Sequence, residues 1–132
     1  SSAGNVNTNN QDAMAYIWCE VPGFSKFGLY YGDGNSDGIF VYTDFRPAFV
    51  LIKNPTTSDE WRIYDAARSP ISEANDYLTY SATAENTTSH PIEFKSNGFK
   101  CQGNADVIND PNTKMYYFAF AEAPFKYGNG SL

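Results

Sequence analysis

Short stretches of aromatic and β-branched residues, each closed by chain breakers, are the feature that most constrains the fold of this chain. Pairs such as Pro22-Gly23 and Asn54-Pro55 separate these stretches. Helical periodicity is weak, since the best window, 72–80, is short and contains Asn and Asp. We therefore expect an all-β fold, an antiparallel β-sandwich resembling a jelly roll, with about eight or nine strands. The expected strands cover residues 14–19, 27–32, 38–43, 48–53, 60–65, 91–96, 98–102 and 114–123.

The patterns within these stretches predict how each strand is buried. Residues 48–53, AFVLIK, form a continuous apolar run that ends at Lys53, as expected of a central strand buried on both faces. Asn97-Gly98 joins two strand patterns and predicts a tight hairpin. Residues 65–90 are polar, so we expect a long surface excursion there. The predicted core residues are Phe49, Leu51, Trp61, Ile63, Phe94, Phe118 and Phe120.

Composition limits the partners of the chain. Its 132 residues suffice for one domain with a core, and its net charge is −6. This acidic balance argues against nucleic acid and anionic membranes, which attract basic proteins. No apolar run is long enough to span a bilayer, so we expect no membrane insertion. Residues 1–13 are polar and are expected to be a linker or the start of a fragment rather than a signal peptide.

Two segments of the chain resemble each other. MAYIWCEVPGFSKF (14–27) and MYYFAFAEAPFKY (115–127) both pass from an aromatic strand through Glu and Pro to Phe, Lys and an aromatic residue. Duplication explains this shared ending, which strand formation does not require. Residues 14–27 would then be the closing strand and link of a preceding repeat, 28–127 the β-sandwich domain, and 128–132 a C-terminal tail. Chance similarity in a chain with 10 Tyr and 10 Phe is the alternative.

The segment GDGNSDG (32–38) has the spacing of a calcium loop. Its polar positions are Asp33, Asn35 and Asp37, with Gly38 next and Asp44 where a twelfth ligand would be. An EF-hand needs helices on both sides, whereas the flanking segments here are strand-like. We therefore favour a structural hairpin turn, with positive φ at its glycines and polar side chains that cap backbone amides. Calcium is the alternative, and no cofactor is expected.

The two cysteines and the polar residues give little sign of chemistry. Cys19 and Cys101 lie in apolar, strand-like settings, so two buried thiols are expected, with a disulfide between them as the alternative. The one histidine, His90, precedes Pro91 in a polar stretch, and no nucleophile motif or phosphate-binding loop is present. We expect no enzymatic activity. A polysaccharide depolymerase is the alternative, with candidate carboxylates Asp59, Glu60, Asp65, Glu73 and Asp76.

Aromatic residues are abundant, at 17% of the chain. Most of them suit strand interiors, where rings fill a core. Some lie near turns or in the polar excursion, where an exposed ring could stack on a sugar. The candidate ligand-binding residues of this kind are Tyr30, Tyr31, Tyr42, Tyr77 and Tyr80.

Four segments are specific in combination. They are PGFSKFGLYYGDGNSDGIFVYTDFRPAFVLIKN (22–54), WRIYDAARSPI (61–71), SNGFK (96–100) and YYFAFAEAPFKY (116–127). Together they resemble a repeated domain at the C-terminal ends of phage tail-fibre and related virion appendage proteins, which is frequent in marine and cyanobacterial phages. The resemblance covers nearly all of 14–127.

The resemblance implies a non-enzymatic domain on the virion surface, made in the host cytoplasm and contacting the host by adhesion. Its implied partners are a host receptor or glycan, other virion proteins, and further copies of itself in a homotrimer. A purely structural decoration domain of the capsid or tail is the alternative. The sequence departs from the family pattern in having Ile39 for the usual Pro, Asp44 for Gly and Cys101 for an aliphatic residue. Because Asp44 is such a departure, the calcium-like spacing looks particular to this chain.

Overall fold

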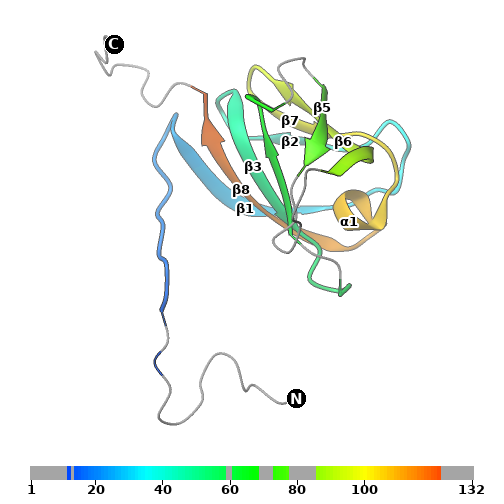
Figure 1. Cartoon of the computed structure of the whole chain (residues 1–132), viewed down its shortest axis with the longest axis horizontal. Coiled ribbons are helices and arrows are strands. Elements are labelled where there is room, and N and C mark those ends of the chain that lie inside the picture. Colours follow the sequence, from blue (N-terminus) through cyan, green and yellow to red (C-terminus); the bar gives the residue numbers. More distant parts are fainter. Residues whose placement is uncertain (1–11, 13, 59–60, 69–72, 78–85, 123–132) are drawn as a thin grey trace.

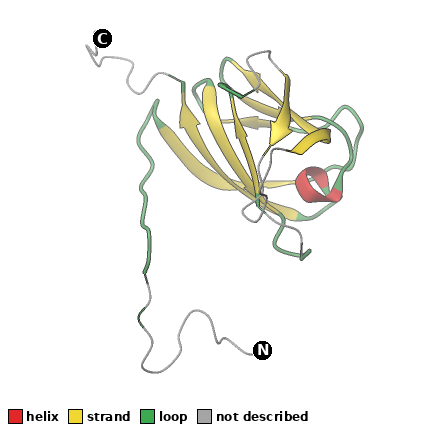
Figure 2. Cartoon of the chain, viewed as in Figure 1, coloured by secondary structure: helices red, strands yellow, loops and turns green. Residues whose placement is uncertain are grey.

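Two four-stranded antiparallel sheets pack face to face and form a β-sandwich, shown in Figure 1 and by secondary structure in Figure 2. The sandwich class predicted from the sequence is therefore confirmed. This computed structural model describes residues 12, 14–58, 61–68, 73–77 and 86–122, with the backbone alone at 73–77 and 86–90.

The strand order places the first and last strands side by side. The first sheet has the order β1 (Ser25–Tyr31), β8 (Lys114–Ala121), β3 (Pro47–Lys53), β4 (Arg62–Asp65). The second has the order β2 (Phe40–Tyr42), β7 (Gly98–Cys101), β6 (Asn86–Lys95), β5 (Glu73–Tyr77). The nested pairs β1–β8 and β2–β7 wrap the chain as in a jelly roll, whereas β3–β4 and β5–β6 join neighbours in the sequence.

Several expected elements differ in the structure. No strand forms at 14–19, where the described residues are extended and exposed. A strand, β5, lies within the window 72–80 that had the best helical pattern, and β6 begins within the expected surface excursion. β1 and β2 belong to different sheets, so the segment 32–38 crosses between sheets and is not a hairpin turn. The prediction that residues 14–27 are the closing strand and link of a preceding repeat is not tested by a structure with one domain.

Alternate residues of the strands meet between the two sheets and form the core. In the first sheet Tyr30, Val50, Tyr64 and Met115 are buried, and in the second Ile92, Phe94, Phe99 and Cys101. Of the seven predicted core residues, Phe94 alone lies here. The other six point from the opposite face of the first sheet and are only partly buried, because the register of each strand turns their neighbours inward. In β4, for example, Tyr64 is fully buried in place of Trp61 and Ile63.

The predicted hairpin is confirmed, with its turn one residue earlier than Asn97-Gly98. Lys95 pairs with Gly98, so that Ser96 and Asn97 form a two-residue connection between β6 and β7. β3 is an interior strand as predicted, between β8 and β4, but only its inward residues are fully buried.

A short helix, α1 (Asp106–Asn109), connects β7 to β8 and is anchored by buried polar groups. The amide of Asn54 donates to the carbonyl of Asp106 at 2.7 Å, and the hydroxyl of Tyr30 donates to the carbonyl of Ile108 at 2.6 Å. These bonds satisfy backbone carbonyls that so short a helix leaves unpaired. Within the described residues, no helix is long and apolar enough to cross a membrane.

The two cysteines have opposite environments, so the expectation of two buried thiols is wrong for one of them. Cys101 is fully buried and Cys19 is exposed, and both are free thiols. Burial raises the pKa of Cys101 to about 12, whereas thiolate formation is what makes a cysteine reactive.

One thiol is therefore expected to react with a thiol reagent in the native protein. Titration with Ellman's reagent at pH 8 should modify Cys19 quickly and Cys101 only after denaturant is added. The variant Cys19→Ser should give no rapid phase. A rapid phase that survives in this variant would show that Cys101 is open to solvent.

Candidate functional site

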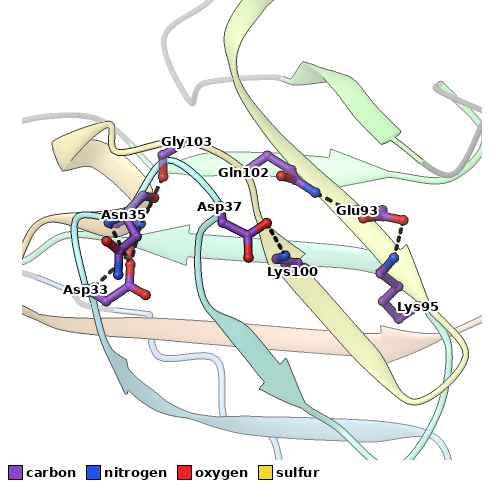
Figure 3. Close-up of polar contacts among 9 residues, drawn as sticks. Asp33, Asn35, Asp37, Glu93, Lys95, Lys100, Gln102 and Gly103 are labelled. Atoms are coloured by element: carbon purple, nitrogen blue, oxygen red, sulfur yellow. Dashed lines mark hydrogen bonds and ion pairs between the residues drawn. The ribbon is translucent and has the colours of Figure 1, made fainter.

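The calcium-like loop is held together by the buried side chain of Asn109. The Nδ2 of Asn109 donates to Asp33 Oδ1 at 2.9 Å, to the carbonyl of Asn35 at 3.1 Å and to the carbonyl of Gly103 at 2.8 Å. Its Oδ1 accepts from the amide of Asp33 at 2.9 Å. Figure 3 shows Asp33, Asn35 and Gly103 grouped in this way. One side chain therefore joins the loop to α1.

The carboxylates of the loop are engaged with protein groups. Asp33 Oδ1 also accepts from the backbone amide of Asn35 at 2.9 Å. These hydrogen bonds lower the pKa of Asp33, and the bond from the Asn35 amide has the largest effect. Asp37 lies 2.8 Å from Lys100, and Asp44 accepts from the hydroxyl of Tyr42 at 2.6 Å beyond β2. Within the described residues, no group of three or more His, Cys, Asp or Glu could hold a metal ion.

Calcium is therefore expected to leave the protein unchanged. Isothermal titration with millimolar Ca²⁺ should give no heat of specific binding. The carboxylate of Asp33 already accepts hydrogen bonds within the loop, and that of Asp37 is paired with a lysine. A saturable signal that disappears in Asp37→Ala would contradict this prediction.

The structure separates the five candidate tyrosines. Tyr30 is buried, with its pKa raised chiefly by burial, so its ring is not available to a ligand. Tyr31 and Tyr42 are about half exposed, at 54% and 52%, on the outer faces of different sheets. Tyr77 lies in β5, where only the backbone is described, and Tyr80 lies outside the described residues.

The candidate carboxylates do not form a described catalytic pair. Asp65 makes an ion pair with Arg68 at 2.8 Å, in the turn that follows β4. Asp59 and Glu60 lie outside the described residues. Glu73 and Asp76, like His90, belong to strands whose side chains are not described there.

Along β6 and β7, the described outer side chains of the second sheet are polar, whereas Phe40 and Tyr42 are exposed on β2 at its edge. Glu93 of β6 is paired with Lys95 and accepts from the amide of Gln102 at 3.0 Å. The lysine contact is the main cause that lowers the pKa of Glu93. Lys100 of β7 reaches Asp37, and Figure 3 shows these pairs along the two strands. This face has the side chains expected of a sheet in contact with water.

The outer face of the first sheet is different, because aromatic and aliphatic side chains cover it. A continuous row crosses all four strands, since Phe27 is opposite Phe118, Phe118 opposite Leu51, and Leu51 opposite Ile63. We call this surface the aromatic face; its residues are Phe27, Leu29, Phe49, Leu51, Trp61, Ile63, Tyr116, Phe118 and Phe120. The first sheet is thus apolar on both sides.

The rings of the aromatic face pack in edge-to-face and tilted pairs around Phe118 and Phe120. The centroid of Phe118 lies 5.3 Å from that of Phe27 and 5.9 Å from that of Trp61, and Phe120 lies 5.9 Å from Phe49. Beside these rings is a hollow of about 430 Å³, lined by Trp18, Phe49, Leu51, Trp61, Phe118 and Phe120. With no polar side chain in its lining, the hollow suits an apolar occupant and lacks the hydrogen-bonding groups that fix a sugar.

Residues 14–20, which we call the arm, precede β1 and run away from the sheets in Figure 1. Trp18 contacts Phe118 edge to face at 6.2 Å, and Tyr16 stacks on Trp18 at 6.0 Å. The arm nevertheless stays open to solvent, with 79% of Met14, 72% of Tyr16 and 91% of Ile17 exposed.

Neither the aromatic face nor the role of Asn109 was predicted from the sequence. Six residues of the aromatic face were assigned to the core, and their signal was real, since a run such as 48–53 is apolar on both sides. Asn109 carries no local signal, because its partners Asp33 and Asn35 are more than 70 residues away.

The fold and its surfaces define a β-sandwich domain with an aromatic outer face on the first sheet and polar outer side chains along β6 and β7 of the second. A family model described as a domain of unknown function (DUF7483) matches residues 1–124, and the chain belongs to this family. No curated protein and no solved structure matches the chain.

Proposed function

We propose that the chain is a non-enzymatic structural domain of a virion appendage, held in its assembly through the aromatic face. The observation that carries this proposal is a sheet that is apolar on both sides, although only one side is covered by the second sheet. Soluble proteins seldom leave so large a contiguous apolar surface open, and such surfaces mark contacts with other proteins. The resemblance to phage tail-fibre domains supplies the kind of assembly, with other virion proteins as partners.

The experiment compares the isolated domain with the intact particle. Peptides of the chain are expected in purified virions of the phage that encodes it, and their absence would overturn the assignment to a virion. Hydroxyl-radical footprinting should then label Trp61 and Phe118 strongly in the isolated domain and weakly in the particle. Tyr42, on the other sheet, serves as the internal reference. Equal labelling of Trp61 in both samples would show that the aromatic face is not an assembly contact.

A second candidate function, host adhesion through a glycan, is favoured by a polar hollow on another part of the surface. This hollow, of about 340 Å³, is lined by residues that include Glu20, Lys26, Thr43 and Asp44. The exposed ring of Tyr42 lies beside it, with Lys26 5.2 Å from the ring centroid. Polar groups around an aromatic ring are what a sugar site needs, and the aromatic face lacks them.

Glycan binding is tested separately with an array of host surface glycans. Binding that is lost in Tyr42→Ala and kept in Tyr31→Ala would support adhesion through the polar hollow. Silence on the array would remove this candidate and leave the structural role. Release of reducing ends from host polysaccharide at high protein concentration would contradict the non-enzymatic assignment.

A further inference from the structure

The aromatic face and the arm are two apolar surfaces of one chain that meet at Trp18, beside the hollow. The arm touches the aromatic face through Trp18 and Phe118, while Ile17 and Tyr16 remain largely exposed. Both the arm and the aromatic face are apolar, so each could cover the exposed apolar surface of the other. The chain thus carries both halves of an interface.

The geometry of the turn keeps the arm from joining its own sheet. Val21 pairs with Ser25, and a hairpin continuing in this register would place Cys19 opposite Phe27. The Glu20 carboxylate instead accepts from the amide of Phe27 at 3.1 Å, which occupies the donor that the next ladder bond would use. The arm therefore leaves the edge of β1.

The arm is suited to lie on a sheet of this kind. Met14, Tyr16 and Trp18 alternate along an extended segment, so their side chains share one side, and the stacked rings of Tyr16 and Trp18 agree with this. The segment also shares its sequence pattern with β8, an interior strand of the same sheet.

The charges near the arm and near the aromatic face have opposite signs. Between Asp12 and Glu20 the chain has two acidic residues and no basic one. Lys53 and Lys114 lie at one end of the aromatic face, in register with Tyr116 and Tyr31 respectively. Glu20 is bonded to the amide of Phe27, so the acidic group that could reach these lysines is Asp12, just before the arm.

We propose that the aromatic face binds the arm of a second copy of this chain, with Tyr16 and Trp18 as anchors beside the hollow. The contact joins the arm of one copy to the face of another, so it closes as a reciprocal pair or as a ring of three. This inference rests on the proposed structural function and names its partner. A face that is protected in the particle while the isolated chain stays monomeric would leave the proposed function standing and overturn this inference.

The first test measures the mass and the tryptophan emission of the full chain across a concentration series. Sedimentation up to about 200 μM should show a closed dimer or trimer, a range that detects micromolar contacts. The chain has two tryptophans, Trp18 and Trp61, and both line the hollow. Their emission should shift to shorter wavelength as the oligomer forms. A monomer throughout this range, with unchanged emission, would overturn the proposal.

The second test assigns the contact to the arm. The double variant Tyr16→Ser, Trp18→Ser alters exposed residues and should weaken association by at least about 30-fold, as expected for aromatic anchors. Tyr42→Ser, a half-exposed ring on the other sheet, is the matched control and should associate like the wild type. An arm variant that associates as tightly as the wild type would overturn the proposal.

Complementation identifies the face as the receiving surface. Trp61→Arg lies outside the strands and should block the hollow while the fold and the arm remain intact. Trp61→Arg alone should be monomeric. Mixed with the arm variant it should form a heterodimer, because one intact arm and one intact face remain. Association of Trp61→Arg alone at wild-type strength would place the contact elsewhere.

Discussion

Replacing Asn109 with aspartate is expected to destabilise the fold by about 3–5 kcal/mol at neutral pH, the cost of a buried charge without a partner. The two side chains have the same shape, so the loss comes from chemistry and not from packing. In the wild type, the side-chain amide of Asn109 donates to oxygen atoms of Asp33, Asn35 and Gly103. In the variant, these three acceptors would lie against a carboxylate that has no proton to donate. Because small domains have about 5–15 kcal/mol of stability, this single change removes a large part of it.

The same substitution should make stability depend on pH in a defined direction. Burial and the negative charge of Asp33 would raise the pKa of the new carboxyl above its unfolded value, about 3.9. The folded state then binds more protons than the unfolded state between the two pKa values, so the stability of the variant falls as pH rises through that range. Urea unfolding at several pH values should show the deficit growing from acid to neutral pH.

The control for this experiment is Asn104→Asp. Asn104 is exposed, one residue from Gly103, and gains the same charge without burial. Its stability is expected to stay within about 0.5 kcal/mol of the wild type. Equal losses in the two variants would mean that the net acidic charge, and not the buried network around Asn109, causes the effect.

Strand positions followed from the sequence better than strand orientation did. The apolar run at 48–53 and the link at Asn97-Gly98 identify β3 and the β6–β7 hairpin, because these signals are local. Alternation predicts which face is buried only when one face is polar. On β3 and β8 both faces are apolar, so Phe118 and its neighbours were assigned to a core that Met115 and Tyr117 occupy.

The acidic loop shows how a local spacing can mislead. The positions of Asp33, Asn35 and Asp37 fit calcium, but their partners come from distant segments, Asn109 and Lys100. The pairing of β1 with β8 and of β2 with β7 brings those partners close, and that pairing depends on the whole chain. The local spacing therefore identifies the polar residues of the loop, whereas the tertiary structure determines which partners they bind.

Asp44 adopts a backbone conformation that is unusual for a residue other than glycine. Asp44 has φ of 73°, in the left-handed region that glycine adopts most easily. Asp44 is among the residues that tolerate this region best, and it accepts a hydrogen bond from Tyr42, which raises the pKa of that tyrosine.

Gly38→Ala is expected to cost about 2–5 kcal/mol of stability, the second large effect. Gly38 has φ of 70°, and a left-handed alanine costs about 1–2 kcal/mol. An added Cβ would also lie 1.5 Å from the carbonyl oxygen of Cys101, so the loop would have to move away from the end of β7. Overpacking of this kind adds about 1–3 kcal/mol. Urea unfolding with circular dichroism measures the sum.

Gly23→Ala separates these two contributions. Gly23 has nearly the same φ, 74°, and an added Cβ there meets nothing within 4 Å. This variant should therefore lose only the conformational part, about 1–2 kcal/mol. The excess loss in Gly38→Ala measures how closely the loop approaches β7. Losses of equal size would mean that the loop 33–38 yields to the added methyl group, and that the carbonyl of Cys101 does not fix its path.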